Sequence, residues 1–548
     1  MDMPFTSPEE RERYLSSGIW GQATLYERFS EHAARMPGKL ALVDGQRQYS
    51  YGEMARLIDT LATYFLAEGI AHGEVVAVQV PDGAELPIAH LALNRIGALC
   101  MPIHASWRET EVAHLLRQGR AVAAIVPANH RDFDYPAMIE SFRDTLPKYR
   151  NTYAIHGAGP GSSAFDALVK DTMINADALA KRRPHQDEPA ALMLSSGTTA
   201  LPKISVFSSN NIHALLQAFA QAVRFVQDDV AAALAPMGTG AIGYCYPVLT
   251  PLLNGGTTVI PEKWSPKAAV DLIKEHRCTY ATGVPAQLTQ MLPTLESHSP
   301  DEFANFRAFN NAGAPLPADV GRQIETLMDC VVLGLYGATD GGTVASTSMD
   351  DPQAKRLHTV GRPFAGREVK LVDANGETVA LGEAGEIHWR SADKSYGYLN
   401  DDEATRTTFS ADGFYKSGDL GVFDADGYLQ IIGRVKDMIL RGGRNLSPRL
   451  IEEALIEHSS ILEVAVAAMP DPVLGERACA FVVLRQGCKL TFDEAIAFLK
   501  ERKVSVWQLP EWLEVMEDLP RSAGGKIAKN QLTQFITGKL AEGASQGA

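Results

Sequence analysis

The sequence predicts an α/β protein with a large first domain and a small α+β unit near its C-terminal end. Its 548 residues exceed the usual size of a single domain. Hydrophobic residues make up 45% of the chain and charged residues 21%, which is the usage of a globular protein. In the first half, short β-branched runs alternate with helical patterns, and this alternation is typical of parallel βαβ units.

The chain begins with two helical patterns that flank a hairpin. We expect helices over 25–36 and 51–69 and a hairpin over 39–50, where Asp44-Gly45 marks the turn. The alternation of strand and helix then continues over 75–80, 85–98, 101–104, 108–119 and 121–127.

The pattern changes past Gly366, where short runs are separated by Asn-Gly, Asp-Gly and single glycines. This punctuation predicts an antiparallel or barrel-like subregion, with short runs at 367–373, 376–380, 385–390 and 427–434. After Arg434, helical patterns at 450–460 and 493–503 and strand patterns at 463–469 and 478–484 predict the small α+β unit. We therefore place the domain junction at Gly433–Asp437, between a first domain at 1–433 and a second at 434–548.

Charge and cysteine content argue against several classes of protein. Lys and Arg number 51 against 66 Asp and Glu, a net charge of −15 that repels phosphate backbones and anionic lipid. We therefore expect neither nucleic acid nor a membrane surface as a partner. The six cysteines form no CxxC pair, and the first fifteen residues lack the apolar stretch of a secretory signal, so we expect a cytoplasmic protein. The uncharged stretch over 230–261 contains several prolines and glycines and predicts buried strands and loops rather than a membrane span.

The most informative local string runs from Leu194 to Lys203. Its hydroxyl side chains, backbone N–H groups and terminal lysine are suited to phosphate oxygens, so it predicts an anion cradle. A Ser/Thr-rich surface loop is the alternative. The candidate phosphate-binding residues are Ser195, Ser196, Gly197, Thr198, Thr199 and Lys203.

A second string, Gly334–Gly342, joins a strand-like run to a glycine-rich turn. Tyr336 could stack on a base, Thr339 could bond a phosphate and Asp340 could hold a hard cation. A purely structural turn would also explain the glycines. Leu335, Gly337 and Ala338 belong to the same candidate site.

Two further strings carry candidate charged residues, the third at 415–420 with 433–438 and the fourth at 520–529. Asp419 suits a ribose diol and Arg434 a phosphate, although the two could equally form an ordinary surface pair. Lys526 follows a glycine pair and would by itself be read as a solvated lysine. Gly238–Gly243 formally matches GxGxxG, but prolines follow where the helix of a dinucleotide site should run.

In this order and at these separations, the four strings resemble the adenylate-forming superfamily of acyl- and aryl-CoA synthetases, stand-alone adenylation enzymes and firefly-type luciferases. The resemblance implies a large N-terminal domain of stacked mixed α/β sheets, a barrel-like subdomain and a small mobile α+β C-terminal domain. It implies catalytic roles for Thr198, Lys203 and Lys526 and a ribose-binding role for Asp419. It further assigns Gly313, Ala314 and Pro315 to the adenine, Lys436 to the hinge, and Gly442 and Gly443 to a thiol tunnel.

The activity implied by the resemblance is a two-step ligation that uses ATP, Mg²⁺ and a carboxylic acid. An acyl-adenylate forms with release of pyrophosphate, and the acyl group then passes to the thiol of CoA. The alternatives are an adenylation enzyme that loads the phosphopantetheine arm of a carrier protein, and a catalytically weak nucleotide-binding homologue. We expect a monomer or a homodimer.

The sequence departs from the family pattern at three places. Asp340 stands where the family has glutamate, and Ala200 replaces a loop glycine. The string Pro236-Met-Gly-Thr-Gly stands where dihydroxybenzoate-activating relatives carry His-Asn, so the pair that would bond ring hydroxyls is missing. We therefore expect a roomy, largely apolar acyl pocket that favours an aromatic, alicyclic or medium-length acid, lined by Gly238, Thr239, Tyr244, Gly313 and Ala338.

Overall fold

A computed structural model describes residues 7–165, 170, 172–195, 201–521 and 527–545. The chain divides into two compact units. The first runs to Val369 and also includes Trp389–Tyr415, and the second comprises Lys370–His388 and the residues from Lys416 onward. Each unit has its own hydrophobic clusters, so each is described by itself.

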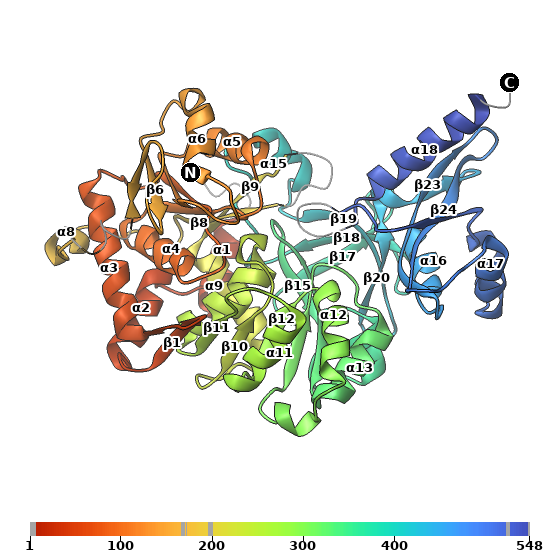
Figure 1. Ribbon diagram of the computed structural model, residues 1–548, viewed down its shortest axis with the longest axis horizontal. Helices are drawn as coiled ribbons and strands as arrows, with labels where there is room; N and C mark the ends of the chain where they lie inside the picture. Colours follow the sequence, from red (N-terminus) through yellow and green to blue (C-terminus); the bar gives the residue numbers. More distant parts are fainter. Residues whose placement is uncertain (1–6, 166–169, 171, 196–200, 522–526, 546–548) are drawn as a thin grey trace. The chain divides into compact units, whose positions relative to one another are not determined.

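Two mixed sheets form the framework of the first unit (Figure 1). Parallel pairing predominates in both, and antiparallel strands occur at their edges. The seven-stranded sheet has the order β7 (Ser162–Ala164), β6 (Asn151–Ile155), β5 (Ala123–Pro127), β3 (Val75–Val78), β4 (Leu99–Pro102), β8 (Pro189–Leu194), β9 (Ile204–Ser208). The nine-stranded sheet has the order β16 (Arg362–Pro363), β15 (Gly342–Ser346), β14 (Val331–Ala338), β13 (Ala308–Asn311), β12 (Tyr280–Gly283), β10 (Val230–Ala233), β11 (Thr257–Ile260), β1 (Leu40–Asp44), β2 (Arg47–Ser50).

A layer of helices packs between these two sheets, because one buried cluster joins apolar side chains of both sheets to the same helices. Phe65, Leu91 and Phe219 of this layer are buried against Val76 and Ala231. The inner helices are α2 (Leu25–Arg35), α3 (Tyr51–Ala67), α4 (Glu85–Ile96), α9 (Ser209–Ala222) and α10 (Thr250–Asn254).

Other helices cover the outer faces. Those on the seven-stranded sheet are α5 (Glu109–Gln118) and α6 (Tyr135–Phe142), and those on the nine-stranded sheet are α11 (Pro266–Glu275), α12 (Pro285–Leu295) and α13 (Ala318–Met328). Short helices α1 (Pro8–Ser16), α8 (Ala176–Ala180), α14 (Gln353–His358) and α15 (Asp402–Thr408) complete the unit.

Local chemistry fixes several boundaries. The Ser50 side chain accepts a hydrogen bond from the Glu53 N–H, which satisfies an otherwise unpaired donor at the start of α3. Gly97 adopts the left-handed conformation that ends α4.

A smaller sheet of four strands follows the first two, in the order β17 (Glu368–Val372), β18 (Gly385–Arg390), β19 (Tyr415–Phe423), β20 (Leu429–Arg434). The rest of the second unit is a sheet packed against three helices. Its strands are β21 (Ile439–Arg441), β22 (Arg444–Leu446), β23 (Ile461–Asp471), β24 (Gly475–Leu484) and β25 (Trp512–Met516), and its helices are α16 (Pro448–Leu455), α17 (Phe492–Glu501) and α18 (Lys529–Ser545).

The predicted α/β class, the hairpin at Asp44-Gly45, the separate sheet past Gly366 and the α+β unit are all confirmed. One expected run is absent among the described strands, since 376–380 contributes only a single bridge, between Thr378 and Val372. A turn at Gly376, with φ of +84°, brings the two residues together without a strand between them. The domain boundary at Gly433–Asp437 stays a prediction.

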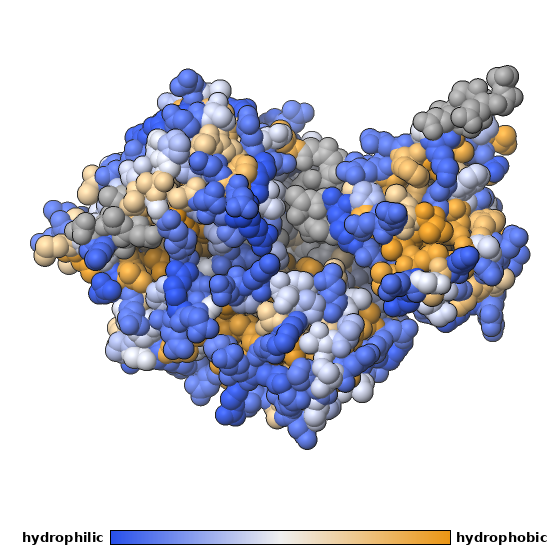
Figure 2. Space-filling model, viewed as in Figure 1, coloured by the Kyte–Doolittle hydropathy of each residue, from blue (hydrophilic) through white to orange (hydrophobic). Residues whose placement is uncertain are grey.

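No helix in the described part of the chain is long and apolar enough to cross a membrane. The uncharged stretch over 230–261 forms β10, a π-helix at Ala241–Leu249, α10 and β11. The surface in Figure 2 is mostly hydrophilic, with apolar residues gathered on one face of the second unit. Trp512 of β25 and Phe535 of α18 are 40% and 45% exposed.

The position of Gly361 provides a test of the packing at the edge of the nine-stranded sheet. Its φ is +84°, and a Cβ there would lie 1.9 Å from the Ser346 carbonyl oxygen. We expect Gly361→Ala to destabilise the first unit by about 3 kcal/mol or more, because backbone must move to make room. Gly73→Ala is the matched control, since its φ is +77° and nothing lies within 4 Å, and it should cost only about 1 kcal/mol. Calorimetric unfolding of both variants checks this, and equal losses of stability would contradict it.

Candidate active site

The predicted phosphate loop begins at the end of β8 and returns to β9. Its ends are joined by two hydrogen bonds. The Ser195 N–H donates to the Lys203 carbonyl at 3.0 Å, and the Lys203 N–H donates to Ser195 Oγ at 3.2 Å. Ser196, Gly197, Thr198 and Thr199 lie outside the described residues, as does Ala200. The structure therefore fixes where this loop starts and ends.

Asp340 lies just past β14 and is only 7% exposed, so it is not a turn carboxylate in solvent. Both of its carboxylate oxygens accept hydrogen bonds from tyrosine hydroxyls. Tyr415 donates to Oδ1 at 2.9 Å, and Tyr398 donates to Oδ2. Burial, and then the charge of Asp340, raise the pKa of both hydroxyls, so both carry their protons at neutral pH.

Lys203 and Asp340 meet through Tyr398, although they are far apart in the sequence. The Lys203 Nζ lies 4.7 Å from the centre of the Tyr398 ring, a cation–π contact. The hydroxyl of that ring is the group that donates to Asp340. The lysine of the predicted phosphate loop and the predicted cation ligand therefore share one location in the first unit.

Glycine is required beside Asp340 because aromatic rings approach the backbone closely. A Cβ at Gly341 would lie 2.6 Å from both the Trp389 and the Tyr415 rings. The Trp389 indole N–H donates to the Gly341 carbonyl at 2.6 Å. Tyr336 contacts the edge of Trp389, with ring centres 5.7 Å apart. Gly341 therefore has a packing role, whereas the Asp340 side chain is held by the two tyrosine hydroxyls.

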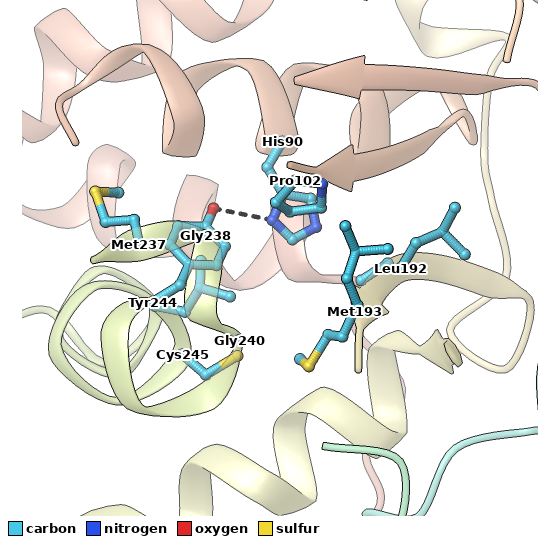
Figure 3. Close-up of a pocket in the computed structure, with 12 residues that line it drawn as sticks. His90, Pro102, Leu192, Met193, Met237, Gly238, Gly240, Tyr244 and Cys245 are labelled. Carbon is cyan, nitrogen blue, oxygen red and sulfur yellow. Dashed lines mark hydrogen bonds between the residues drawn. The ribbon is translucent and has the colours of Figure 1, made fainter. Parts of the chain in front are cut away.

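A small cavity lies between residues of β8 and residues of the π-helix (Figure 3). His90 of α4 and Tyr244 of the π-helix contact each other in its wall, with His90 Nδ1 2.9 Å from the Tyr244 hydroxyl. Burial lowers the pKa of His90 to about 4, so the ring is neutral at pH 7. The remaining walls are mainly apolar and come from Pro102, Ala191, Leu192, Met193, Leu194, Met237, Gly238, Gly240, Cys245 and Leu249.

The cavity has a volume of about 20 Å³, which is space for roughly one water molecule. The apolar lining agrees with the prediction, but the cavity is much smaller than the roomy pocket that was predicted. Met193 and Met237 contribute unbranched, flexible side chains to its walls, and rotation of such side chains can enlarge a cavity.

Of the predicted pocket residues, Gly238 and Tyr244 line the cavity, whereas Gly313 and Ala338 are not among its lining residues. The side chain of Thr239 lies outside the described ones. A Cβ at Gly240 would lie 3.8 Å from Thr339 Oγ1, which places this wall of the cavity beside the second string.

Asp419 and Arg434 face each other on β19 and β20 of the second unit. The Arg434 Nε donates to Asp419 Oδ1 at 2.7 Å, and both side chains remain partly accessible. The two predicted nucleotide ligands are therefore brought together, and they pair with each other in this structure.

The remaining predicted positions lie in turns. Gly313 has φ of +87° and follows β13, and the Asn311 side chain donates to the Ala314 carbonyl at 3.2 Å. Lys436 lies in the short turn between β20 and β21. Gly442 and Gly443 both have positive φ in the turn between β21 and β22. Lys526 lies outside the described residues.

The described residues fit a magnesium ion held mainly by substrate phosphates. Mg²⁺ in such sites takes one or two carboxylates and keeps several waters. Asp340 supplies one carboxylate, and each oxygen retains acceptor capacity after one hydroxyl bond. In the described ranges no group of three or more His, Cys, Asp or Glu side chains gathers as a ready-made metal cage.

Sequence reasoning did not identify Tyr398 or His90. Tyr398 lies in the string Gly397-Tyr-Leu-Asn400, which matches none of the four strings, and its partners are Lys203 and Asp340. His90 is one of 14 histidines, and its neighbours on α4 at 86–89 and 91–93 are apolar. Only the tertiary contacts single out either residue.

Comparison with known proteins gives the same family over nearly the whole chain. The family model described as "AMP-binding enzyme" matches residues 29–399, and the model "AMP-binding enzyme C-terminal domain" matches 450–526. The medium-chain fatty-acid–CoA ligase of Escherichia coli (strain K12) is 33% identical over 97% of this chain and 94% of its own. The 2,3-dihydroxybenzoate-AMP ligase of Bacillus subtilis (strain 168) is 28% identical over 98% of each chain. ATP-bound MatB from Rhodopseudomonas palustris superposes with a TM-score of 0.83 at 25% identity, covering 94% of this chain and 99% of MatB.

The buried His90 predicts a specific dependence of stability on pH. Its pKa is about 4 in the folded chain against 6.5 ordinarily, so the unfolded chain binds more protons between these values. Stability from the neutral ring is complete above pH 6.5, and about 3 kcal/mol of it is lost as pH falls to 4. His90→Gln keeps an amide partner for Tyr244 but does not titrate, so its unfolding temperature should fall less over this range. Parallel curves for the two proteins would contradict the assignment.

Proposed function

The chain belongs to the family of AMP-binding enzymes, and we propose that it converts an apolar carboxylic acid to its acyl-adenylate and then to its CoA thioester. The observation that carries this proposal is the junction of Lys203, Tyr398 and Asp340 at one place. A phosphate-binding lysine and a carboxylate suited to Mg²⁺ are what an ATP triphosphate requires.

In the first step, a carboxylate oxygen attacks the α-phosphorus of ATP, and the bond from that phosphorus to the bridging oxygen breaks to release pyrophosphate. Both reactants are anionic, so the site must neutralise charge and hold them in line. We assign this to Lys203, Thr198 and Lys526, with Asp340 holding Mg²⁺. Bound there, Mg²⁺ would neutralise charge on the phosphates.

In the second step, the thiol sulfur attacks the acyl carbonyl carbon, the carbon–oxygen bond to phosphate breaks, and AMP leaves. The thiol proton passes to solvent. We assign the ribose to Asp419, the adenine to Gly313–Pro315 and Tyr336, and the approach of the thiol to Gly442 and Gly443. Lys436 is the proposed hinge between the two steps.

The proposed acid is apolar because the cavity beside Thr339 is lined mainly by methionine, leucine and alanine side chains. A pyrophosphate-release screen over aromatic, alicyclic and medium-length acids tests this class. Release with apolar acids and not with polyhydroxylated aromatic acids supports the proposal, and the reverse order contradicts it.

A carrier protein is the second candidate acceptor, and a specific observation favours it. Trp512 and Phe535 expose apolar surface on the second unit, and such surface often marks a protein contact. The dihydroxybenzoate-AMP ligase is named for adenylation alone.

Supplying acyl-AMP with either CoA or a phosphopantetheinylated carrier protein separates the two acceptors. We expect thioester formation with CoA. Trp512→Ser should then leave the rate unchanged. If the thioester forms only on the carrier protein, and Trp512→Ser lowers the rate, the acceptor is the carrier protein and not CoA.

Lys526→Ala should reduce pyrophosphate release by at least about a hundredfold, because a cation at the reacting oxygens is lost. Transfer from supplied acyl-AMP to thiol should survive. Lys529→Ala is the control, because that nearby lysine pairs with Glu452 at 2.6 Å. Equal losses in both half-reactions would remove the assigned role from Lys526.

A further inference from the structure

Tyr398 contacts two groups of opposite charge through different parts of its side chain. Its hydroxyl donates to Asp340 Oδ2, and its ring lies 4.7 Å from Lys203 Nζ. The side chain is buried, with the residue 7% exposed. A phenylalanine would keep the second contact and lose the first, so the two contacts can be separated by substitution.

The backbone around Tyr398 explains why its ring lies beside Lys203. Residues 396–399 run next to β9, which begins directly after Lys203. The Tyr396 N–H donates to the Val206 carbonyl at 2.8 Å, and the Leu399 N–H donates to the Ile204 carbonyl at 2.7 Å. The Tyr398 N–H is bonded to Thr405 Oγ1 at 2.9 Å. This segment is therefore held in register with the end of the phosphate loop.

Tyr415 holds the same carboxylate from another element. It lies at the start of β19 and donates to Asp340 Oδ1 at 2.9 Å, while its ring packs on Trp389 with centres 4.6 Å apart. Each carboxylate oxygen thus has one hydroxyl donor, and the plane of the carboxylate is fixed. Tyr415→Phe is therefore a matched comparison. It removes one of the two hydroxyl donors to Asp340 and leaves the Tyr398 ring beside Lys203 unchanged.

We propose that Tyr398 is a positioning residue that couples the phosphate-loop lysine to the magnesium carboxylate. Its hydroxyl aims Asp340 at the metal, and its ring keeps the Lys203 ammonium beside the triphosphate. The proposal rests on the proposed function only in taking Mg·ATP as the ligand. Asp340 is shorter than a glutamate by one methylene. Its two hydroxyl donors hold the carboxylate in one orientation, so its oxygens keep the same position relative to the metal.

ATP binding measured by calorimetry tests the two contacts separately, without acid or thiol present. A magnesium titration reports on Asp340, and binding in EDTA reports on Lys203. Tyr398→Phe should raise the Mg²⁺ concentration for half-maximal binding about tenfold, because a hydrogen bond to a metal ligand is lost. Tyr415→Phe should do the same. In EDTA both variants should bind ATP as the unmodified chain does.

Tyr398→Leu removes both contacts. It should show the same magnesium shift and also bind ATP about threefold more weakly in EDTA, because the cation–π contact is lost. Tyr398→Met repeats the comparison if the leucine variant does not fold. Thermal unfolding of each variant detects a purely structural role. If Tyr398 only stabilises the fold, its substitution lowers the melting temperature and shifts neither binding curve.

Superimposable magnesium titrations for the unmodified chain and Tyr398→Phe would overturn the role of the hydroxyl. Equal EDTA affinities for Tyr398→Phe and Tyr398→Leu would overturn the role of the ring. Failure of the proposed function would look different, since no acid would then release pyrophosphate while these binding differences persisted.

Discussion

The arrangement of the first unit depends on the buried carboxylate of Asp340. A buried charge without partners costs several kcal/mol, so this position is tolerable only because two hydroxyls donate to it. Those hydroxyls come from the segment beside β9 and from the start of β19. One charge therefore ties the end of β14 to two segments that follow it by more than fifty residues, and Lys203 joins the group through the ring of Tyr398.

The cavity proposed for the acyl group depends on the same sheet geometry. β8 ends at the predicted phosphate loop and also supplies Leu192 and Met193 to the cavity wall. The π-helix supplies Tyr244, whose hydroxyl is bonded to His90 rather than presented alone. That bond occupies His90 Nδ1 and the Tyr244 hydroxyl, and most other lining residues are apolar, so the cavity suits apolar groups. Gly240 and Thr339 place one wall of the cavity beside the second string.

Much of the fold could be predicted because its signals are local. Period and capping residues mark helices such as α3, and Asp44-Gly45 marks a hairpin. The prediction of a strand at 376–380 was wrong because the residues after the turn at Gly376 have the composition of a short strand but form only a single bridge. Ser195 and Lys203 could be identified because they belong to one string. The bonds of Asp340 to Tyr398 and Tyr415 could not, because those residues come together only in the folded chain. Cavity volume depends on Met193 and Met237, whose rotamers no sequence pattern specifies.

Transfer of oxygen from the acid to AMP tests the central claim most directly. With a carboxylate labelled in both oxygens by oxygen-18, attack on the α-phosphorus and later cleavage of the acyl–oxygen bond leave one labelled oxygen in AMP. Mass spectrometry of the products should find that single label in AMP and none in pyrophosphate. Thioester formed with unlabelled AMP would contradict an acyl-adenylate and the account built on it.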